Sequence, residues 1–153
     1  MANLTLPFIA TWLVTLAGGL VVLGALGALT NDSEISPLFA PYRLAWTGWS
    51  LEVVALLVAL YALAIGPFRN WRATILFFYA SVTGFLIPLT NDIFVAKGKL
   101  PGSNGSDARA NAAGAGLILV FIGNYVQAIL AALHDTDEPK AQTAQVAGDK
   151  DLA

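Results

Sequence analysis

The sequence predicts an all-α protein, a four-helix transmembrane bundle with both termini on the same side of the membrane. Its 153 residues are 57% hydrophobic and only 12% charged, whereas soluble domains carry about 25% charged residues. The mean hydropathy is +0.68. The hydrophobic residues gather into four runs, each close to the ~20 residues that a helix needs to cross a bilayer. An even number of spans returns the chain to the side on which it began.

The four spans are expected at residues 6–29, 44–65, 73–89 and 112–133. The first span is not read as a signal peptide, because it lacks a basic segment before it and exceeds the usual apolar core of about 7–15 residues. Residues 1–133 therefore form one transmembrane domain. Residues 134–153 are polar and have no periodic apolar face, so we expect a disordered tail.

Positive charge does not fix the orientation, because each side carries four Lys or Arg residues: Arg69, Arg72, Lys140 and Lys150 against Arg43, Lys97, Lys99 and Arg109. The dense pair in the short second loop favours the cytosol for that loop and for both termini. The sequons at Asn31 and Asn104 then fall in lumenal loops and predict a glycoprotein, although the sequon at Asn3 falls on the opposite side. We expect an integral multi-pass protein of the endoplasmic reticulum or another endomembrane.

A short motif occurs twice, as Leu29–Asp32 and as Leu89–Asp92, each reading LTND. Each copy is expected to close an odd-numbered span, which places Asp32 and Asp92 at the same membrane face. Duplication of a two-helix unit and chance are both open explanations.

Glu52 lies inside the second apolar run. A carboxyl group at that depth costs roughly 2.5–3.5 kcal/mol, and such residues usually face a protein interior or a wet cavity and mark functional sites. Its helical face holds small residues that let neighbouring helices approach closely: Ala45, Gly48, Ala55 and Ala59. We therefore predict that Glu52 faces the interior of the bundle.

Other polar and aromatic residues are expected around Glu52. A rise of ~1.5 Å per residue places Glu52 roughly 12 Å, and Asn124 roughly 18 Å, below the face that carries the two aspartates. This predicts a vestibule that descends from Asp32 and Asp92 to Glu52. The candidate substrate-binding residues along it are Asn124, Gln127, Tyr79, Tyr125 and Trp49.

The chain has no cysteine and a single histidine, so neither a metal nor another cofactor is expected. Carboxyl groups remain, and they support general acid–base catalysis. Burial favours the neutral form of Glu52, which would donate a proton, while the better solvated Asp32 or Asp92 would act as the base. Suitable reactions are epoxide hydrolysis, cyclisation and double-bond isomerisation of a lipophilic small molecule that arrives from the membrane lipid. A net charge of −2 gives no basic footprint for nucleic acid.

Each candidate also has a structural interpretation. Glu52 can lock helix packing by pairing with Asn124, Gln127 or Tyr125. The amides of Asn124 and Gln127 are common links between membrane helices, and Trp49 suits an interfacial belt of aromatic residues. Asn-Asp at a helix end is ordinary turn chemistry.

With its size, its four spans, Glu52 in the second span and Asp92 after the third, the chain resembles the small integral-membrane tailoring enzymes of fungal secondary metabolism. These include the polyether-type epoxide hydrolases and, more distantly, the membrane-bound terpene cyclases, which have more spans. The resemblance implies a hydrolase, cyclase or isomerase. The layout is also similar to that of four-span MARVEL-type proteins, which implies a non-enzymatic accessory or scaffold protein. A third alternative is a proton-coupled carrier, which would assemble as a homo-oligomer to enclose its path.

Overall fold

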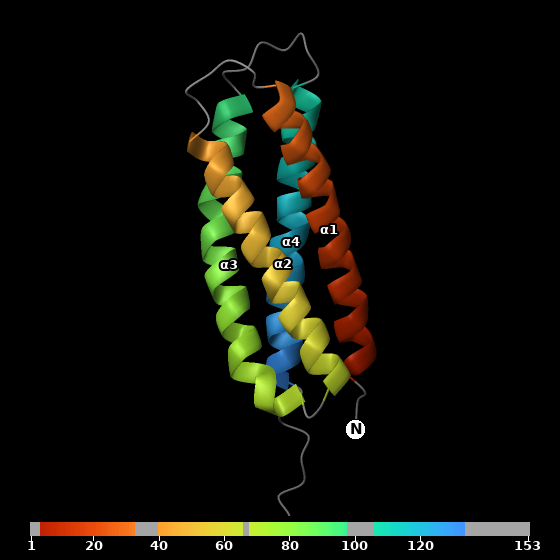
Figure 1. The fold of residues 1–153 in the computed structure, drawn as a ribbon. Coiled ribbons are helices and arrows are strands. Elements are labelled where there is room, and N and C mark those ends of the chain that lie inside the picture. The colour runs from red at the N-terminus through yellow and green to blue at the C-terminus, as the bar shows by residue number, and fades with distance from the viewer. Residues whose placement is uncertain (1–3, 33–39, 66–67, 98–105, 134–153) are drawn as a thin grey trace, which may run out of the picture.

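The computed structural model describes residues 4–32, 40–65, 68–97 and 106–133. In these residues all regular structure is α-helical: α1 (Thr5–Asp32), α2 (Ala40–Ile65), α3 (Phe68–Lys97) and α4 (Ser106–Leu133). Each helix contains a segment long and apolar enough to cross a membrane. The predicted all-α four-helix transmembrane bundle is confirmed (Figure 1), and it indicates an integral multi-pass membrane protein.

The helices form a ring in the order α1, α2, α3, α4. Each packs against its two neighbours in that order, while α1 and α3, like α2 and α4, lie diagonally and have no close backbone approach in the described segments. Consecutive helices run in opposite directions, so the start of α1 and the end of α4 lie at one end of the bundle, called the lower end here (Figure 1). The predicted tail, 134–153, and the sequons at Asn3 and Asn104 lie outside the described residues.

Helices α3 and α4 extend further toward the upper end than the sequence predicted. The third span was expected to end at residue 89, yet α3 continues through Pro88 to Lys97, and α4 begins at Ser106 instead of residue 112. Proline is tolerated inside membrane helices where neighbouring groups compensate for the lost N–H donor. Beyond Pro88, Ile93 is only 6% exposed, so burial against the other helices continues past the hydropathy boundary. The second LTND copy therefore lies inside α3, and the prediction that it closes the span is wrong.

The closest packing in the bundle joins α1 to α4. A Cβ atom added to Gly18 would lie 3.0 Å from the carbonyl oxygen of Gly116, and one added to Gly116 would lie 2.9 Å from the carbonyl oxygen of Gly18. Small residues at such positions let helix backbones approach in lipid, where van der Waals packing drives association. The two glycines thus set the α1–α4 spacing.

The seam between α1 and α2 is the least extensive of the four, and tryptophan side chains occupy it. Trp12 donates its indole N–H to the carbonyl oxygen of Leu56, and Trp49 donates to the carbonyl oxygen of Gly19, both over 3.0 Å. Nearer the upper end Trp46 donates to Thr30 Oγ1 over 3.2 Å. Between α1 and α2 the two helices are therefore joined through large indole rings, whereas α1 and α4 are joined by direct backbone contact.

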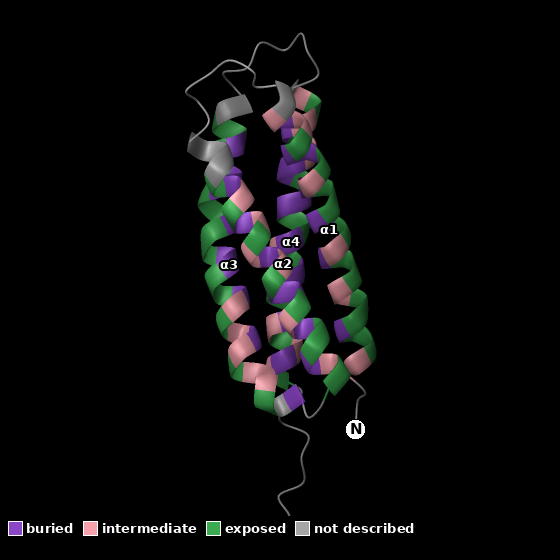
Figure 2. Ribbon diagram, viewed as in Figure 1, coloured by how far each residue is buried: buried purple, intermediate pink, exposed green. Residues whose placement is uncertain are grey.

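Buried and exposed residues alternate along every helix (Figure 2). The outward faces carry large apolar side chains, such as Phe77 at 69% and Leu57 at 57% exposed. A soluble protein rarely shows so much apolar surface, whereas a surface in contact with lipid tails requires it. A smaller set of polar residues lies on the inward faces, and five of the buried polar side chains there form the candidate site.

Candidate functional site

A layer of buried polar side chains crosses the interior of the bundle. Its members are at most 2% exposed, and they come from all four helices: Thr15 of α1, Glu52 of α2, Tyr79 of α3, and Asn124 and Gln127 of α4. The predicted inward orientation of Glu52 is thereby confirmed. The layer contains two separate hydrogen-bonded groups, which differ in how fully their polar atoms are used.

The first group is the pair of Glu52 and Asn124. Asn124 Nδ2 donates a hydrogen bond of 2.8 Å to Glu52 Oε2. Of the three partners expected for Glu52, which were Asn124, Gln127 and Tyr125, Asn124 is therefore the one that bonds to it. The pair crosses the α2–α4 diagonal, where the two backbones do not approach each other. A long acidic side chain and a shorter amide together span that gap.

The second group is centred on Gln127. Its Oε1 accepts a hydrogen bond of 2.5 Å from the Tyr79 hydroxyl, and its Nε2 donates to Thr15 Oγ1 over 2.8 Å and to the carbonyl oxygen of Gly123 over 3.3 Å. Thr15 in turn donates to the carbonyl oxygen of Thr11 over 2.9 Å. Gln127 therefore ties α4 to both α1 and α3, and its amide has both its donor and its acceptor groups engaged.

The close approach of α1 that this group requires depends on Gly123. A Cβ atom at that position would collide with Thr15 Oγ1. Glycine therefore lets the Thr15 hydroxyl lie against the backbone of α4, within reach of Gln127. The sequence pattern did not indicate this contact, because it joins residues more than 100 positions apart.

The Glu52–Asn124 pair, unlike the Gln127 group, keeps unused polar atoms. Glu52 Oε1 and Asn124 Oδ1 are buried and have no hydrogen-bond partner. Leaving a buried polar group unsatisfied costs about 1–3 kcal/mol, and a native structure that does so requires an explanation, such as a chemical role. The contrast is that the Gln127 amide is bonded to protein groups through both its oxygen and its nitrogen, whereas Glu52 and Asn124 each keep one oxygen without a protein partner.

Two indole rings lie near Glu52 on the α1–α2 side. Trp49, one turn before Glu52 in α2, bonds to Gly19 of α1, while Trp12 of α1 bonds to Leu56, one turn after Glu52. Both tryptophans are half-buried. The sequence analysis names Trp49 as a candidate binding residue but not Trp12. The feature that could have indicated Trp12 is its position inside a span, because tryptophans of membrane proteins usually gather at the interface.

The remaining candidates lie away from this pair. Tyr125 is 56% exposed on the outer face of α4, so it does not join the buried layer beside Asn124. Asp92 is exposed, thirteen residues beyond Tyr79 in α3, which is roughly 20 Å along the helix axis. The side chain of Asp32 lies outside the described residues.

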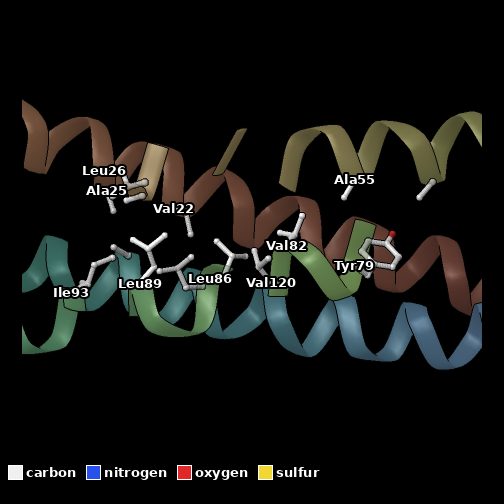
Figure 3. Packing of buried hydrophobic residues seen from close by; sticks show 14 of the residues in the cluster. Val22, Ala25, Leu26, Ala55, Tyr79, Val82, Leu86, Leu89, Ile93 and Val120 are labelled. Carbon is white, nitrogen blue, oxygen red and sulfur yellow. The ribbon is translucent and has the colours of Figure 1, made fainter. Parts of the chain in front are cut away.

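The interior above the polar layer is largely packed with apolar side chains, and the buried polar residues there are Thr83 and Thr90 of α3. Figure 3 shows Leu89, Leu86 and Val82 in succession between Ile93 and Tyr79, with Val22 and Leu26 of α1 beside them. The expectation of a polar vestibule from Asp92 to Glu52 is therefore wrong for the described part of the interior.

The first two residues of the LTND motif are placed alike in both copies. In both copies the leucine is buried, at 3% for Leu29 and 1% for Leu89. In both, the threonine hydroxyl donates to the carbonyl oxygen four residues earlier, over 2.7 Å for Thr30 and 2.8 Å for Thr90. In the second copy Asn91 and Asp92 are exposed, so the aspartate of that copy does not enter the bundle.

Two negative findings complete the description of the site. Among the described residues, no group of three or more His, Cys, Asp or Glu side chains lies together in a way that could hold a metal ion; His134 lies outside them. No protein-family model, curated protein or solved structure matches the chain. The resemblance to fungal tailoring enzymes therefore stays a prediction.

Proposed function

We propose that the protein is a membrane-embedded general acid–base enzyme that acts on a lipophilic small molecule, with Glu52 as the group that gives and takes the proton. One observation carries the proposal: a carboxyl group 2% exposed in the bundle interior retains an unpartnered oxygen, Oε1. Intramembrane carboxyl groups are costly and usually functional. Helix packing alone gives no reason to place an ionisable carboxyl group there, since Gln127 already links three helices.

A single carboxyl group narrows the chemistry. Among the residues whose side chains the structure describes, Glu52 is the only buried acidic residue, and Asp92 is exposed and far along α3. The suitable reactions are those in which one group protonates the substrate and its conjugate base removes a proton elsewhere. In double-bond isomerisation, the acid adds a proton to one alkene carbon and its carboxylate then takes a proton from a neighbouring carbon. Proton-initiated cyclisation ends in the same way, and neither reaction consumes water or needs a cofactor.

The surroundings of Glu52 support a lipophilic substrate. The site lies among apolar helices, and one of the two seams that α2 forms, that with α1, is the least extensive in the bundle. Trp12 and Trp49 line that seam on either side of Glu52. Their large apolar faces suit a lipophilic molecule that enters laterally from the bilayer. An endomembrane such as the endoplasmic reticulum is the proposed location, because lipophilic intermediates reside in such membranes.

The test compares cells that produce the wild type with cells that produce Glu52→Gln at equal abundance. Lipophilic extracts are profiled by untargeted mass spectrometry, and the expected result is a pair of isomers whose ratio changes with the wild type and not with the variant. Asp92→Asn is the matched control, since it removes an exposed carboxyl group from the same bundle. Identical extracts from wild type and Glu52→Gln overturn the proposal.

The competing function is that of a non-enzymatic four-span accessory protein. The saturated Gln127 group and the glycine contacts of α1 and α4 favour it, because both serve packing alone. It predicts that Glu52→Gln alters assembly with a partner while extracts stay unchanged. A proton-coupled carrier would use the same carboxyl in a homo-oligomer, and proteoliposome flux lost in Glu52→Gln would identify it.

A further inference from the structure

The two unpartnered oxygens of the site belong to side chains that already bond to each other. Asn124 Nδ2 donates to Glu52 Oε2 over 2.8 Å, while Glu52 Oε1 and Asn124 Oδ1 have no donor. If Glu52 were ionised, both unpartnered atoms would be acceptors. Two such acceptors buried in one pair are satisfied only by something that brings a donor.

A single proton supplies that donor. A carboxylic acid and a primary amide are complementary, because the amide N–H bonds to the acid carbonyl while the acid O–H bonds to the amide carbonyl. We infer that the Glu52–Asn124 pair is a proton-binding site in which Glu52 Oε1 carries the proton and donates it to Asn124 Oδ1. Asn124 is then a positioning residue that holds the acid neutral and oriented. This inference deepens the proposed function and rests on it for its catalytic meaning.

The groups around Glu52 favour the protonated state. The buried polar side chains of the neighbouring helices are uncharged: Thr15 of α1, and Tyr79, Thr83 and Thr90 of α3. The Tyr79 hydroxyl is committed to Gln127. Among the side chains that the structure describes, no Lys, Arg or His is buried, so no positive charge faces the carboxyl group there. Burial of a charge without a partner is far more costly than burial of its neutral form. A metal cation is a poorer occupant, because two free oxygens fall well short of the ligand shell that cations such as Ca²⁺ or Mg²⁺ take.

The inference gives the pair a second property. Once Glu52 loses its proton to a substrate, Oε1 becomes an acceptor that faces the acceptor Oδ1, and the bond across the α2–α4 diagonal is weakened. Because the backbones of α2 and α4 make no close approach in the described segments, little else holds this diagonal together directly. Release of the proton is thereby coupled to loosening of the bundle beside the reacting group.

Infrared difference spectroscopy of the full chain in lipid nanodiscs tests the inference. At neutral pH we expect the carbonyl band of a protonated carboxylic acid, lost in Glu52→Gln and unchanged in Asp92→Asn. In Asn124→Leu the band should persist and move to higher frequency, because the acid carbonyl no longer accepts a hydrogen bond. Asn124→Ser, whose side chain is too short to span the pair, should give the same shift and serves if the leucine variant does not fold.

Three outcomes overturn the inference. The first is that no acid band at neutral pH depends on Glu52. The second is a band whose frequency does not change when Asn124 is substituted, and the third is a carboxylate signal that responds to added Na⁺. The results remain distinct from those of the extract comparison. A Glu52 acid band with identical extracts leaves the proton site standing and removes the enzyme. Extracts that change with Glu52 in the absence of the acid band support the enzyme and overturn the proton site.

Discussion

Asn124 of α4 donates a hydrogen bond of 2.8 Å to Glu52 of α2, and the bond crosses the diagonal of the bundle. One turn along α4, Gln127 bonds to Tyr79 and Thr15 and so links α4 to the two helices beside it. The two amides share a helix face yet differ in how many of their polar atoms are hydrogen-bonded. Gln127 is saturated by protein groups, whereas the Asn124 pair keeps two free oxygens.

Replacement of Tyr79 and Gln127 should reveal the structural half of the layer. Tyr79→Phe and Gln127→Leu each remove one side of a buried bond, so a double-mutant cycle should give a coupling energy of about 0.6 kcal/mol, the average for such bonds in membrane helices, and at most about 1.7 kcal/mol. Unfolding in detergent measures it. Tyr125→Phe is the control, because that hydroxyl belongs to a side chain 56% exposed. A coupling near zero would show that the Tyr79–Gln127 bond does not contribute to stability.

Gly123→Ala should destabilise the bundle by about 1–3 kcal/mol, as overpacking does, because the added Cβ collides with Thr15 Oγ1. Thr15→Ala removes the colliding hydroxyl, so the double variant should recover part of the loss. Gly24→Ala is the matched control in α1: a Cβ there meets nothing within 4 Å, and alanine is the better helix former. Equal effects of the two glycine variants on the melting temperature would contradict the described contact.

The tryptophans of the α1–α2 seam should affect both stability and substrate. Trp12→Phe and Trp49→Phe each delete an indole donor to a backbone carbonyl and should lower the free energy of unfolding by about 0.5–1.5 kcal/mol. They should also change the isomer ratio in lipophilic extracts. Trp71→Phe, which changes a ring packed edge-to-face against Tyr61 away from the seam, should leave that ratio unaltered. An equal change in extracts from all three variants would argue against entry through the seam.

Cysteine labelling should report the helical phase of the second LTND copy, since the chain has no natural cysteine. Asp92→Cys is expected to react rapidly with a water-soluble maleimide in detergent, because Asp92 is exposed. Leu89→Cys, at a position 1% exposed, should react slowly until the protein is denatured. Comparable rates at both positions in the folded protein would mean that the apolar packing above the polar layer is open.

The sequence by itself determined the four membrane helices and the inward face of Glu52. Both follow from local pattern: the length and hydropathy of each run set the spans, and the small residues around Glu52 on its own helix set its face. Helix ends were less well determined. The sequence placed the end of α3 at the hydropathy boundary near Leu89, whereas packing of Ile93 continues the helix to Lys97.

Only the tertiary structure decided which polar groups meet. The rotation and spacing of four helices pair Glu52 with Asn124, give Gln127 to Tyr79 and Thr15, and turn Tyr125 and Asp92 outward. Those choices depend on contacts between distant positions, such as the room that Gly123 leaves for Thr15. Hydrophobic periodicity indicates which side of a helix faces inward, but hydrogen bonds need alignment within a few tenths of an ångström between helices, which no single helix specifies.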